Sequence, residues 1–212
     1  NGINIYNSQF QIIPGGILQT PYVTLYTPTG LNRPHQYIFL PWPDDTNKFV
    51  LFYCVPELPA VSSGPCPNGW GWLSTHLYYT VLDKTLNGGL GGIISTSNIA
   101  LTDTLIHATG LAAVKHANGR DWWVIMHRYY SNMYYKLLVT SDTIIVSTQN
   151  IGSVITSDIG GQAVFSQDGR MFAMISPSAV DQLDIFQFDR CTGIFYNPVT
   201  IATPTIYGPF GC

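Results

Sequence analysis

The stretch that decides the fold is Leu111-Ala-Ala-Val-Lys-His-Ala-Asn-Gly-Arg120, which runs directly into Asp121-Trp-Trp-Val-Ile-Met126. An apolar run ends in Asn-Gly, an arginine follows, and a second apolar run begins. Asn-Gly allows the positive φ angles that a tight hairpin turn requires. The stretch therefore predicts two antiparallel β-strands joined by a turn at Asn118-Gly119.

The same pattern returns later in the chain. Gln162-Ala-Val-Phe-Ser-Gln-Asp-Gly-Arg170 leads into Met171-Phe-Ala-Met-Ile175, and its turn at Asp168-Gly169 follows the first turn by 50 residues. A repeat of this length is typical of proteins built from stacked copies of one supersecondary unit. We therefore expect the two stretches to begin equivalent units.

Two further strands complete each unit. They are expected at Met133–Thr140 and Thr143–Thr148 in the first unit, and at Leu183–Phe188 and Ile194–Ile201 in the second. All four runs are rich in β-branched and aromatic residues and are bounded by turn residues, as strands are. Each unit is therefore predicted to be a four-stranded antiparallel sheet.

A longer unit precedes these two and has the same order. Its strands are expected at Gln36–Leu40, Lys48–Cys54, His76–Leu82 and Gly92–Ser97, with an insertion over Val55–Ser74. The chain is thus predicted to be one all-β region over residues 1–212. We expect a β-propeller with four-stranded antiparallel blades at 34–101, 109–155 and 160–202.

The two ends resemble incomplete units. Residues 1–20 are expected to hold the last strands of a preceding blade, and residues 205–212 the first strand of a following one. A closed propeller has four to eight whole blades. We therefore expect a partial arc of a larger ring, although the leftover strands could instead complete a fourth blade.

The composition indicates an extracellular protein. The chain has 212 residues and only 10% are charged, against roughly 25% in a typical soluble domain. A net charge of −3 provides no field that attracts nucleic acid or an anionic membrane. No apolar run reaches the roughly 20 residues that a membrane helix needs.

The four cysteines are Cys54, Cys66, Cys191 and Cys212. Their even number and the low charge fit an oxidising compartment. We expect the pairs Cys54–Cys66 and Cys191–Cys212, and four buried free thiols remain the alternative. A zinc site is disfavoured, because there is no CxxC pair and no histidine at ligand spacing from a cysteine.

Three stretches together carry a family resemblance: Leu77-Tyr-Tyr-Thr-Val-Leu-Asp-Lys-Thr-Leu-Asn-Gly-Gly-Leu-Gly91, Ala113-Val-Lys-His-Ala-Asn-Gly-Arg-Asp-Trp-Trp123 and Phe188-Asp-Arg-Cys-Thr-Gly193. They resemble the WD40-like β-propeller repeats of large secreted proteins of Bacteroidetes-type bacteria, including gliding-associated surface proteins. Such proteins often carry a sorting domain for type IX secretion. The resemblance implies a propeller, with seven blades, that is exported to the cell surface or medium. It implies no catalytic residues.

The aromatic candidates for ligand contact are Trp70 and Trp72, which lie in the insertion after Cys66. An aromatic loop on a rigid scaffold suits contact with carbohydrate or protein. The alternative is that these side chains cover the edge of a blade. In the pair Trp122-Trp123, neighbouring side chains of a strand point to opposite faces, so both are expected to pack between sheets.

No catalytic constellation or cofactor site is predicted. The chain has neither a GxSxG nucleophile elbow nor an HExxH motif. His116 and His127 on adjacent strands could form a metal pair, and Asp44-Asp45-Thr46-Asn47 could hold Ca²⁺. Ordinary strand histidines and an ordinary hairpin turn are favoured, because neither group has enough ligands. We therefore expect no metal.

The predicted function is a non-catalytic extracellular or cell-surface module that contacts a protein or glycan, for adhesion or assembly. The partners would be an unknown protein or carbohydrate, and the rest of a larger chain or neighbouring subunits. The alternatives are a propeller enzyme of lactonase, lyase or glycosidase type and a structural subunit of a filament or layer. Acids and histidines in the central channel would favour the enzyme, and an apolar, Ser/Thr-lined channel would favour the binding module.

Overall fold

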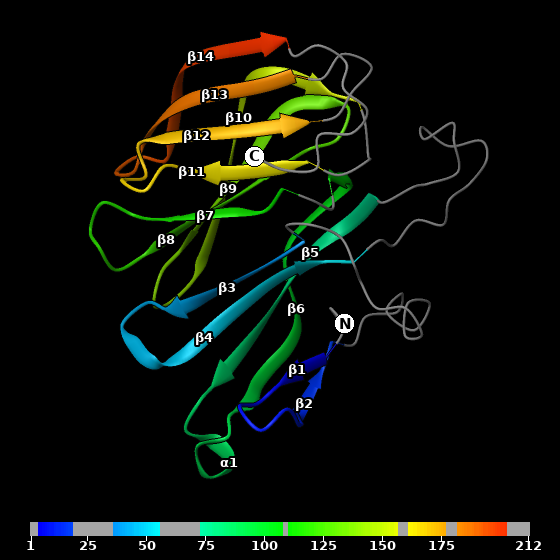
Figure 1. Cartoon of the computed structure of the whole chain (residues 1–212), viewed down its shortest axis with the longest axis vertical. Helices are drawn as coiled ribbons and strands as arrows, with labels where there is room; N and C mark the ends of the chain where they lie inside the picture. The colour runs from blue at the N-terminus through cyan, green and yellow to red at the C-terminus, as the bar shows by residue number, and fades with distance from the viewer. Residues whose placement is uncertain are drawn as a thin grey trace, which may run out of the picture.

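The computed structural model describes residues 4–18, 36–55, 73–107, 110–156, 161–176 and 182–202. Within these ranges the chain forms strands and one four-residue helix (Figure 1). No helix in them is long and apolar enough to cross a membrane. The elements are β1 (Asn4–Tyr6), β2 (Ile12–Ile17), β3 (Tyr37–Trp42), β4 (Asp45–Cys54), β5 (Leu73–Asp83), α1 (Leu86–Gly89), β6 (Gly92–His107), β7 (Ala112–Lys115), β8 (Trp122–His127), β9 (Ser131–Val139), β10 (Ile144–Ile155), β11 (Gln162–Phe165), β12 (Met171–Ser176), β13 (Gln182–Asp189) and β14 (Ile194–Ala202).

The strands form three four-stranded sheets and one two-stranded hairpin. The sheets are β3-β4-β5-β6, β7-β8-β9-β10 and β11-β12-β13-β14, and the hairpin is β1-β2. Within each sheet and within the hairpin, strands that follow each other along the chain pair antiparallel. The prediction of an all-β chain with four-stranded antiparallel units is confirmed. The described sheets do not close into a ring.

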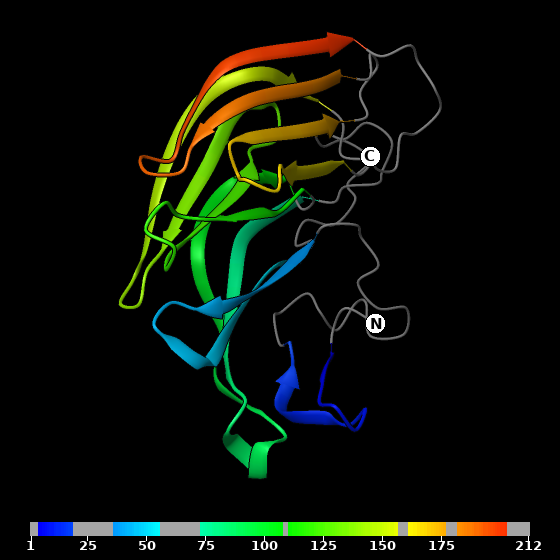
Figure 2. The same ribbon diagram turned by 60° about the vertical axis from the view of Figure 1, so that its left-hand side comes forward.

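Consecutive sheets lie against each other (Figures 1 and 2), and equivalent strands of the second and third sheets are neighbours. The first strands β7 and β11 are neighbours, and the last strand β10 lies beside β14. The hairpin strand β2 lies beside β6, the last strand of the next sheet. The hairpin thus takes the place that the last strands of a preceding sheet would have.

The two repeat-defining turns have the same geometry. Gly119 N donates to His116 O over 3.0 Å, and Gly169 N donates to Ser166 O over 2.8 Å. Both glycines have positive φ, +74° and +71°, whereas the residues before them do not. The turns therefore span four residues and end in a left-handed glycine, in place of the expected two-residue turns.

A side chain before each glycine completes the turn. Asn118 Oδ1 accepts from the backbone N of Arg120, and Asp168 Oδ1 accepts from the backbone N of Arg170. These short side chains satisfy backbone donors that the turn would otherwise leave open. The 50-residue repeat seen in the sequence is thus reproduced hydrogen bond by hydrogen bond.

Alanine at the two glycines tests this turn. Gly119→Ala should lower the free energy of unfolding by about 1 kcal/mol, because an L-residue is strained at positive φ. An added Cβ at this position meets nothing within 4 Å, so no steric clash adds to the loss. Gly169→Ala should cost more, because its Cβ would lie 2.4 Å from Val114 Cγ2 and 2.7 Å from Arg190 Cδ. Urea unfolding of both variants checks this, and equal losses would contradict the close packing at Gly169.

Side chains from facing sheets build two cores. Between the second and third sheets, Gln149 on β10 binds the backbone of Phe195 on β14 through both its amide atoms, at 2.6 and 3.0 Å. The buried hydrophobic residues of this core are Ala112, Val114, Trp123, Ile125, Tyr129, Tyr134, Ile155, Ala163, Phe172, Met174, Phe186, Phe188 and Phe195. The core lies between sheets, so each sheet depends on its neighbour for burial.

The tryptophan pair packs as expected. Trp122 points to the first sheet, where its Nε1 donates to Pro41 O over 3.0 Å. Trp123 points to the third sheet, where its Nε1 donates to Arg190 O over 2.9 Å and its ring meets Phe188 edge-on. One strand therefore ties three sheets together.

Two strands are longer than the apolar pattern predicted. The strand expected to end at Ser97 continues to His107, and the one expected to end at Thr148 continues to Ile155. The second half of β6 reaches the second sheet, where Ile106 forms a bridge with Arg128 and Asp103 pairs with the same arginine at 3.2 Å. Partners on the neighbouring sheet hold these Thr-, Ser- and Asn-rich segments.

Candidate functional site

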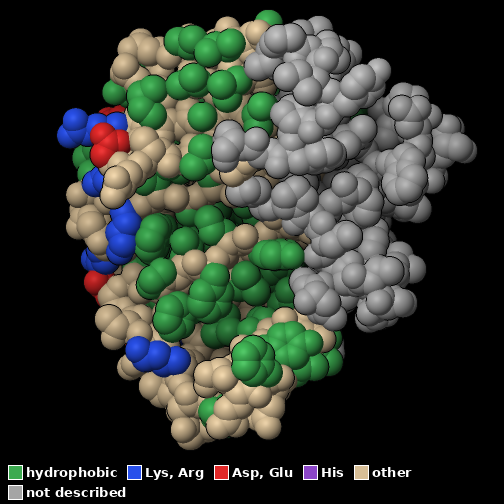
Figure 3. Space-filling view, in the orientation of Figure 1, with side chains coloured by type: hydrophobic (Ala, Val, Ile, Leu, Met, Phe, Trp, Pro, Cys, Tyr) green, Lys and Arg blue, Asp and Glu red, His purple; other side chains and the backbone are tan. Residues whose placement is uncertain are grey.

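Charged side chains gather where the first and second, and the third and fourth, strands of the sheets are joined. Figure 3 shows Lys, Arg and Asp side chains along the left edge, where these turns lie in Figure 1. Away from these turns, the charged residues of the described part are Asp103, Arg128, Lys136 and Asp184. The charged side chains of the described residues are therefore concentrated at the turn end of the sheets.

A cleft of about 520 Å³ runs along the first strands of the three sheets; we call it the channel cleft. Figure 3 shows hydrophobic side chains in the hollow between β3 and the pair β7 and β11. Its polar side chains are Lys115, Ser166, Gln167 and Arg190, and the described lining contains no acid and no histidine. The lining residues are Ile38, Leu111, Ala112, Ala113, Val114, Lys115, Trp122, Ala163, Val164, Phe165, Ser166, Gln167 and Arg190.

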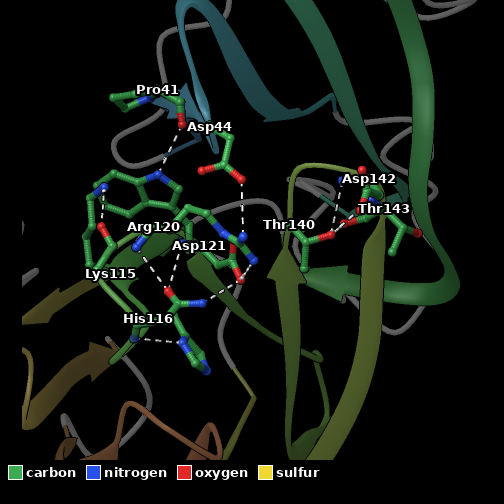
Figure 4. Close-up of polar contacts among 12 residues, drawn as sticks. Pro41, Asp44, Lys115, His116, Arg120, Asp121, Thr140, Asp142 and Thr143 are labelled. Atoms are coloured by element: carbon green, nitrogen blue, oxygen red, sulfur yellow. Dashed lines mark hydrogen bonds and ion pairs between the residues drawn. The ribbon is translucent and has the colours of Figure 1, made fainter.

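One wall of the channel cleft is fixed by a tryptophan and a lysine. The Nζ of Lys115 lies 4.6 Å from the centroid of the Trp122 ring and donates to Gly119 O over 3.1 Å. The indole donates to Pro41 O on the first sheet, as Figure 4 shows. A cation above an indole face is attracted by the negative charge of that face, so the two side chains stabilise each other.

An arginine and two aspartates join the first two sheets beside this wall (Figure 4). Arg120 holds Asp121 through Nε at 2.8 Å and Nη2 at 3.2 Å, and reaches Asp44 through Nη1 at 3.1 Å. The hydrogen bond from Arg120, then that from Asn118, lowers the pKa of Asp121 although burial opposes it. Asp121 is thus an ionised structural carboxylate and is unsuited to act as a general acid.

A second cleft, of about 690 Å³, adjoins the first at Arg190; we call it the arginine cleft. It lies between the β11–β12 turn, the β13–β14 turn and the tip of the β7–β8 turn. Its lining residues are Ala117, Asp168, Arg170, Phe188, Asp189, Arg190, Cys191 and Tyr196. Neither arginine was singled out from the sequence, although Arg170 occupies the repeat position of Arg120.

Several predicted site residues lie outside the described ranges. These are Trp70 and Trp72, together with Cys66 and Cys212. Cys54 is buried on β4, and Cys191 is exposed in the β13–β14 turn. Because each expected disulfide has one member outside the described residues, both pairings and the contact role of the two tryptophans stay predictions.

The residues considered for metal binding have other partners. Asp44 pairs with Arg120 at 3.1 Å, and Asp45 pairs with Lys48 at 2.8 Å. His116 accepts from the backbone N of Asn118 at 3.0 Å, so its other ring nitrogen donates to Cys191 O, also at 3.0 Å. Within the described ranges, no three His, Cys, Asp or Glu side chains lie close enough together to hold a metal ion.

No protein-family model matches the chain, and no curated protein matches it. The chain is similar to a crystal structure from Bacteroides uniformis, that of a provisionally assigned 6-phosphogluconolactonase, with 12% identity and a TM-score of 0.40. The match covers 79% of this chain and 57% of that one, so this chain spans less than two thirds of its length. A TM-score below 0.5 does not establish a shared fold, and the likeness carries no argument about activity.

Proposed function

We propose that the chain is an arc of a seven-bladed β-propeller and acts as a non-catalytic extracellular module that contacts a protein or a glycan. The observation that carries the proposal is the lining of the channel cleft. Aliphatic and aromatic side chains, with Lys115, Gln167 and Arg190 near its end, line this cleft, and no acid or histidine is among the described lining residues. Acid–base catalysis needs a titratable group within reach of the substrate, whereas ligand binding needs only shape, apolar area and a few polar groups.

The stacking of the sheets supports the arc. In the second and third sheets the first strands lie beside each other, and so do the last strands, as in propeller blades arranged around an axis. The outward face of the third sheet exposes apolar side chains, among them Val164, Tyr196, Val199 and Ile201, which are 41–53% exposed. A further blade would cover that face in the way that the third sheet covers the second.

A binding screen with the purified chain tests the proposal. Immobilised glycans and extracellular proteins are presented to the chain, and Lys115→Ala and Gln167→Ala are expected to weaken the binding that is found. Lys84→Ala, which changes a lysine between β5 and α1, is the matched control and should bind as the original chain does. Trp70→Ala and Trp72→Ala test whether the insertion loop takes part.

An activity assay tests the alternative that the chain is an enzyme. We expect no turnover of sugar lactones or aryl glycosides above the rate in buffer. Turnover that is lost on changing a residue of the channel cleft would overturn the proposal.

A further inference from the structure

We infer that the arginine cleft binds the carboxylate of an acidic sugar through Arg170 and Arg190. The inference rests on the proposed binding function and names the ligand class. It follows from comparing two arginines that the 50-residue repeat places in equivalent positions, Arg120 and Arg170. The first has carboxylate partners, and the second has none among the residues that the structure describes.

Arg120 shows how this turn position holds a carboxylate. Its Nε and Nη2 donate side by side to the two oxygens of Asp121, the next residue. Such a paired contact is the strongest geometry that an arginine offers to a carboxylate. At the equivalent place after Arg170 the chain has Met171, so the neighbouring carboxylate is missing.

Arg170 is positioned but unpaired. Its backbone N donates to Asp168 Oδ1 over 3.1 Å, and its carbonyl accepts from Phe188 N over 2.8 Å, so its main chain is tied to β13. The side chain is exposed and lines the cleft. Among the described residues, no ion pair or hydrogen bond occupies its guanidinium group.

Arg190 is held more firmly and presents one open edge. Its carbonyl accepts from Trp123 Nε1 at 2.9 Å and from Ala117 N at 3.1 Å. Its Nη1 donates to Asp168 O over 3.0 Å, which orients the guanidinium group. The Nε and Nη2 edge, the one that Arg120 uses on Asp121, has no partner within the described part of the chain.

The two acids of the cleft do not take the place of the missing carboxylate, because each serves its own turn. Asp168 Oδ1 accepts from Ser166 Oγ at 2.6 Å, and Asp189 accepts from Cys191 N and Thr192 Oγ1, both at 2.8 Å. These hydrogen bonds lower the pKa of both aspartates, and the charge of Arg170 adds to the lowering of the pKa of Asp168 without forming an ion pair. Both are ionised at neutral pH, and neither forms an ion pair with Arg170 or Arg190.

The ionised acids select the kind of anion. Two arginines and two aspartates line the cleft and leave it without net charge, so it offers a phosphate or a polyanionic peptide no net attraction. A singly charged carboxylate surrounded by hydroxyl groups fits better. The second oxygen of Asp168 accepts no hydrogen bond from the described residues, so it can accept one from a sugar hydroxyl.

Calorimetric titration with trigalacturonate tests the inference, with its methyl ester and a neutral galactose trisaccharide as comparison ligands. We expect the acid to bind and both comparison ligands to bind at least tenfold more weakly. Arg170→Ala and Arg190→Ala should each weaken trigalacturonate binding about tenfold or more. Arg190→Lys should restore part of the affinity, because lysine keeps the charge but lacks the planar fork.

Arg120→Ala is the matched control, because Arg120 has the same place in its turn but its carboxylate partners lie within the chain. It should bind trigalacturonate as the original chain does, and circular dichroism confirms folding for every variant. Neutral and acidic ligands that bind equally, or binding that survives both arginine changes, overturns the inference and leaves the proposed function standing. Inorganic phosphate or polyglutamate that binds as well as the sugar also overturns it. If no glycan or protein binds at all, the proposed function fails with it.

Discussion

A Tyr134→Ala variant is expected to lose about 3–5 kcal/mol of unfolding free energy, the usual cost of removing a large aromatic side chain from a core. Tyr134 on β9 is fully buried between the second and third sheets. Its ring centroid lies 5.8 Å from that of Phe172, 5.6 Å from that of Phe186 and 5.4 Å from that of Phe195. The three partners belong to the third sheet, so the change opens a cavity where the sheets meet.

Tyr134→Phe is the matched control for the size of the ring. It keeps the aromatic contacts and removes only the hydroxyl, whose oxygen lies 3.5 Å from Met174 Sδ. We expect a loss below about 1.5 kcal/mol, the limit for changes that conserve volume. Urea denaturation followed by tryptophan fluorescence measures both variants. If alanine and phenylalanine cost the same, the ring does not join the two sheets.

The order of the strands was predictable because turns and apolar runs are local signals. Asn118-Gly119 and Asp168-Gly169 mark equivalent turns, and the runs around them read as strands without knowledge of the rest of the chain. The opposite orientations of Trp122 and Trp123 also follow from the two-residue period of a strand. Local chemistry was therefore enough for the four-stranded units.

Contacts between sheets were not predictable in this way. The second half of β6 continues to pair with β5, and it also reaches the second sheet, where Asp103 and Ile106 both contact Arg128. The amide of Gln149 replaces a backbone partner for Phe195, across 46 residues of sequence. The type of a polar residue does not indicate with which distant group it will form a hydrogen bond.

The arginine cleft was not predicted for the same reason, because it depends on contacts between distant segments. The sequence places an arginine after each repeat turn, but it does not show that Arg120 has carboxylate partners while Arg170 has none among the described residues. The predicted contact residues Trp70 and Trp72 were chosen for their aromatic loop, a local signal that the described ranges do not test. The arginine cleft forms where the β11–β12 and β13–β14 turns meet in space, and that meeting is not visible in the sequence of either turn.

Asp184→Ala is expected to lower the free energy of unfolding by about 2–3 kcal/mol, because it removes the charged acceptor of three hydrogen bonds. Asp184 on β13 is 4% exposed. It accepts from Ser153 N at 2.8 Å and Ser153 Oγ at 2.9 Å on the neighbouring sheet, and from Thr200 Oγ1 at 2.6 Å on β14. Asp184→Asn keeps one acceptor oxygen and should cost about half as much.

A double-mutant cycle shows whether this carboxylate joins the sheets. Ser153→Ala removes the hydroxyl donor alone, so part of the cost of Asp184→Ala is already present in that variant. Residues that share a hydrogen bond couple by about 0.5–3 kcal/mol, and the double variant should therefore lose less than the sum of the single losses. Additive losses in urea denaturation would mean that Asp184 stabilises only its own sheet. Coupling would show that this carboxylate, like Gln149, is a polar link between the second and third sheets, which otherwise meet through apolar side chains. Such a link fixes the position of one sheet relative to the next.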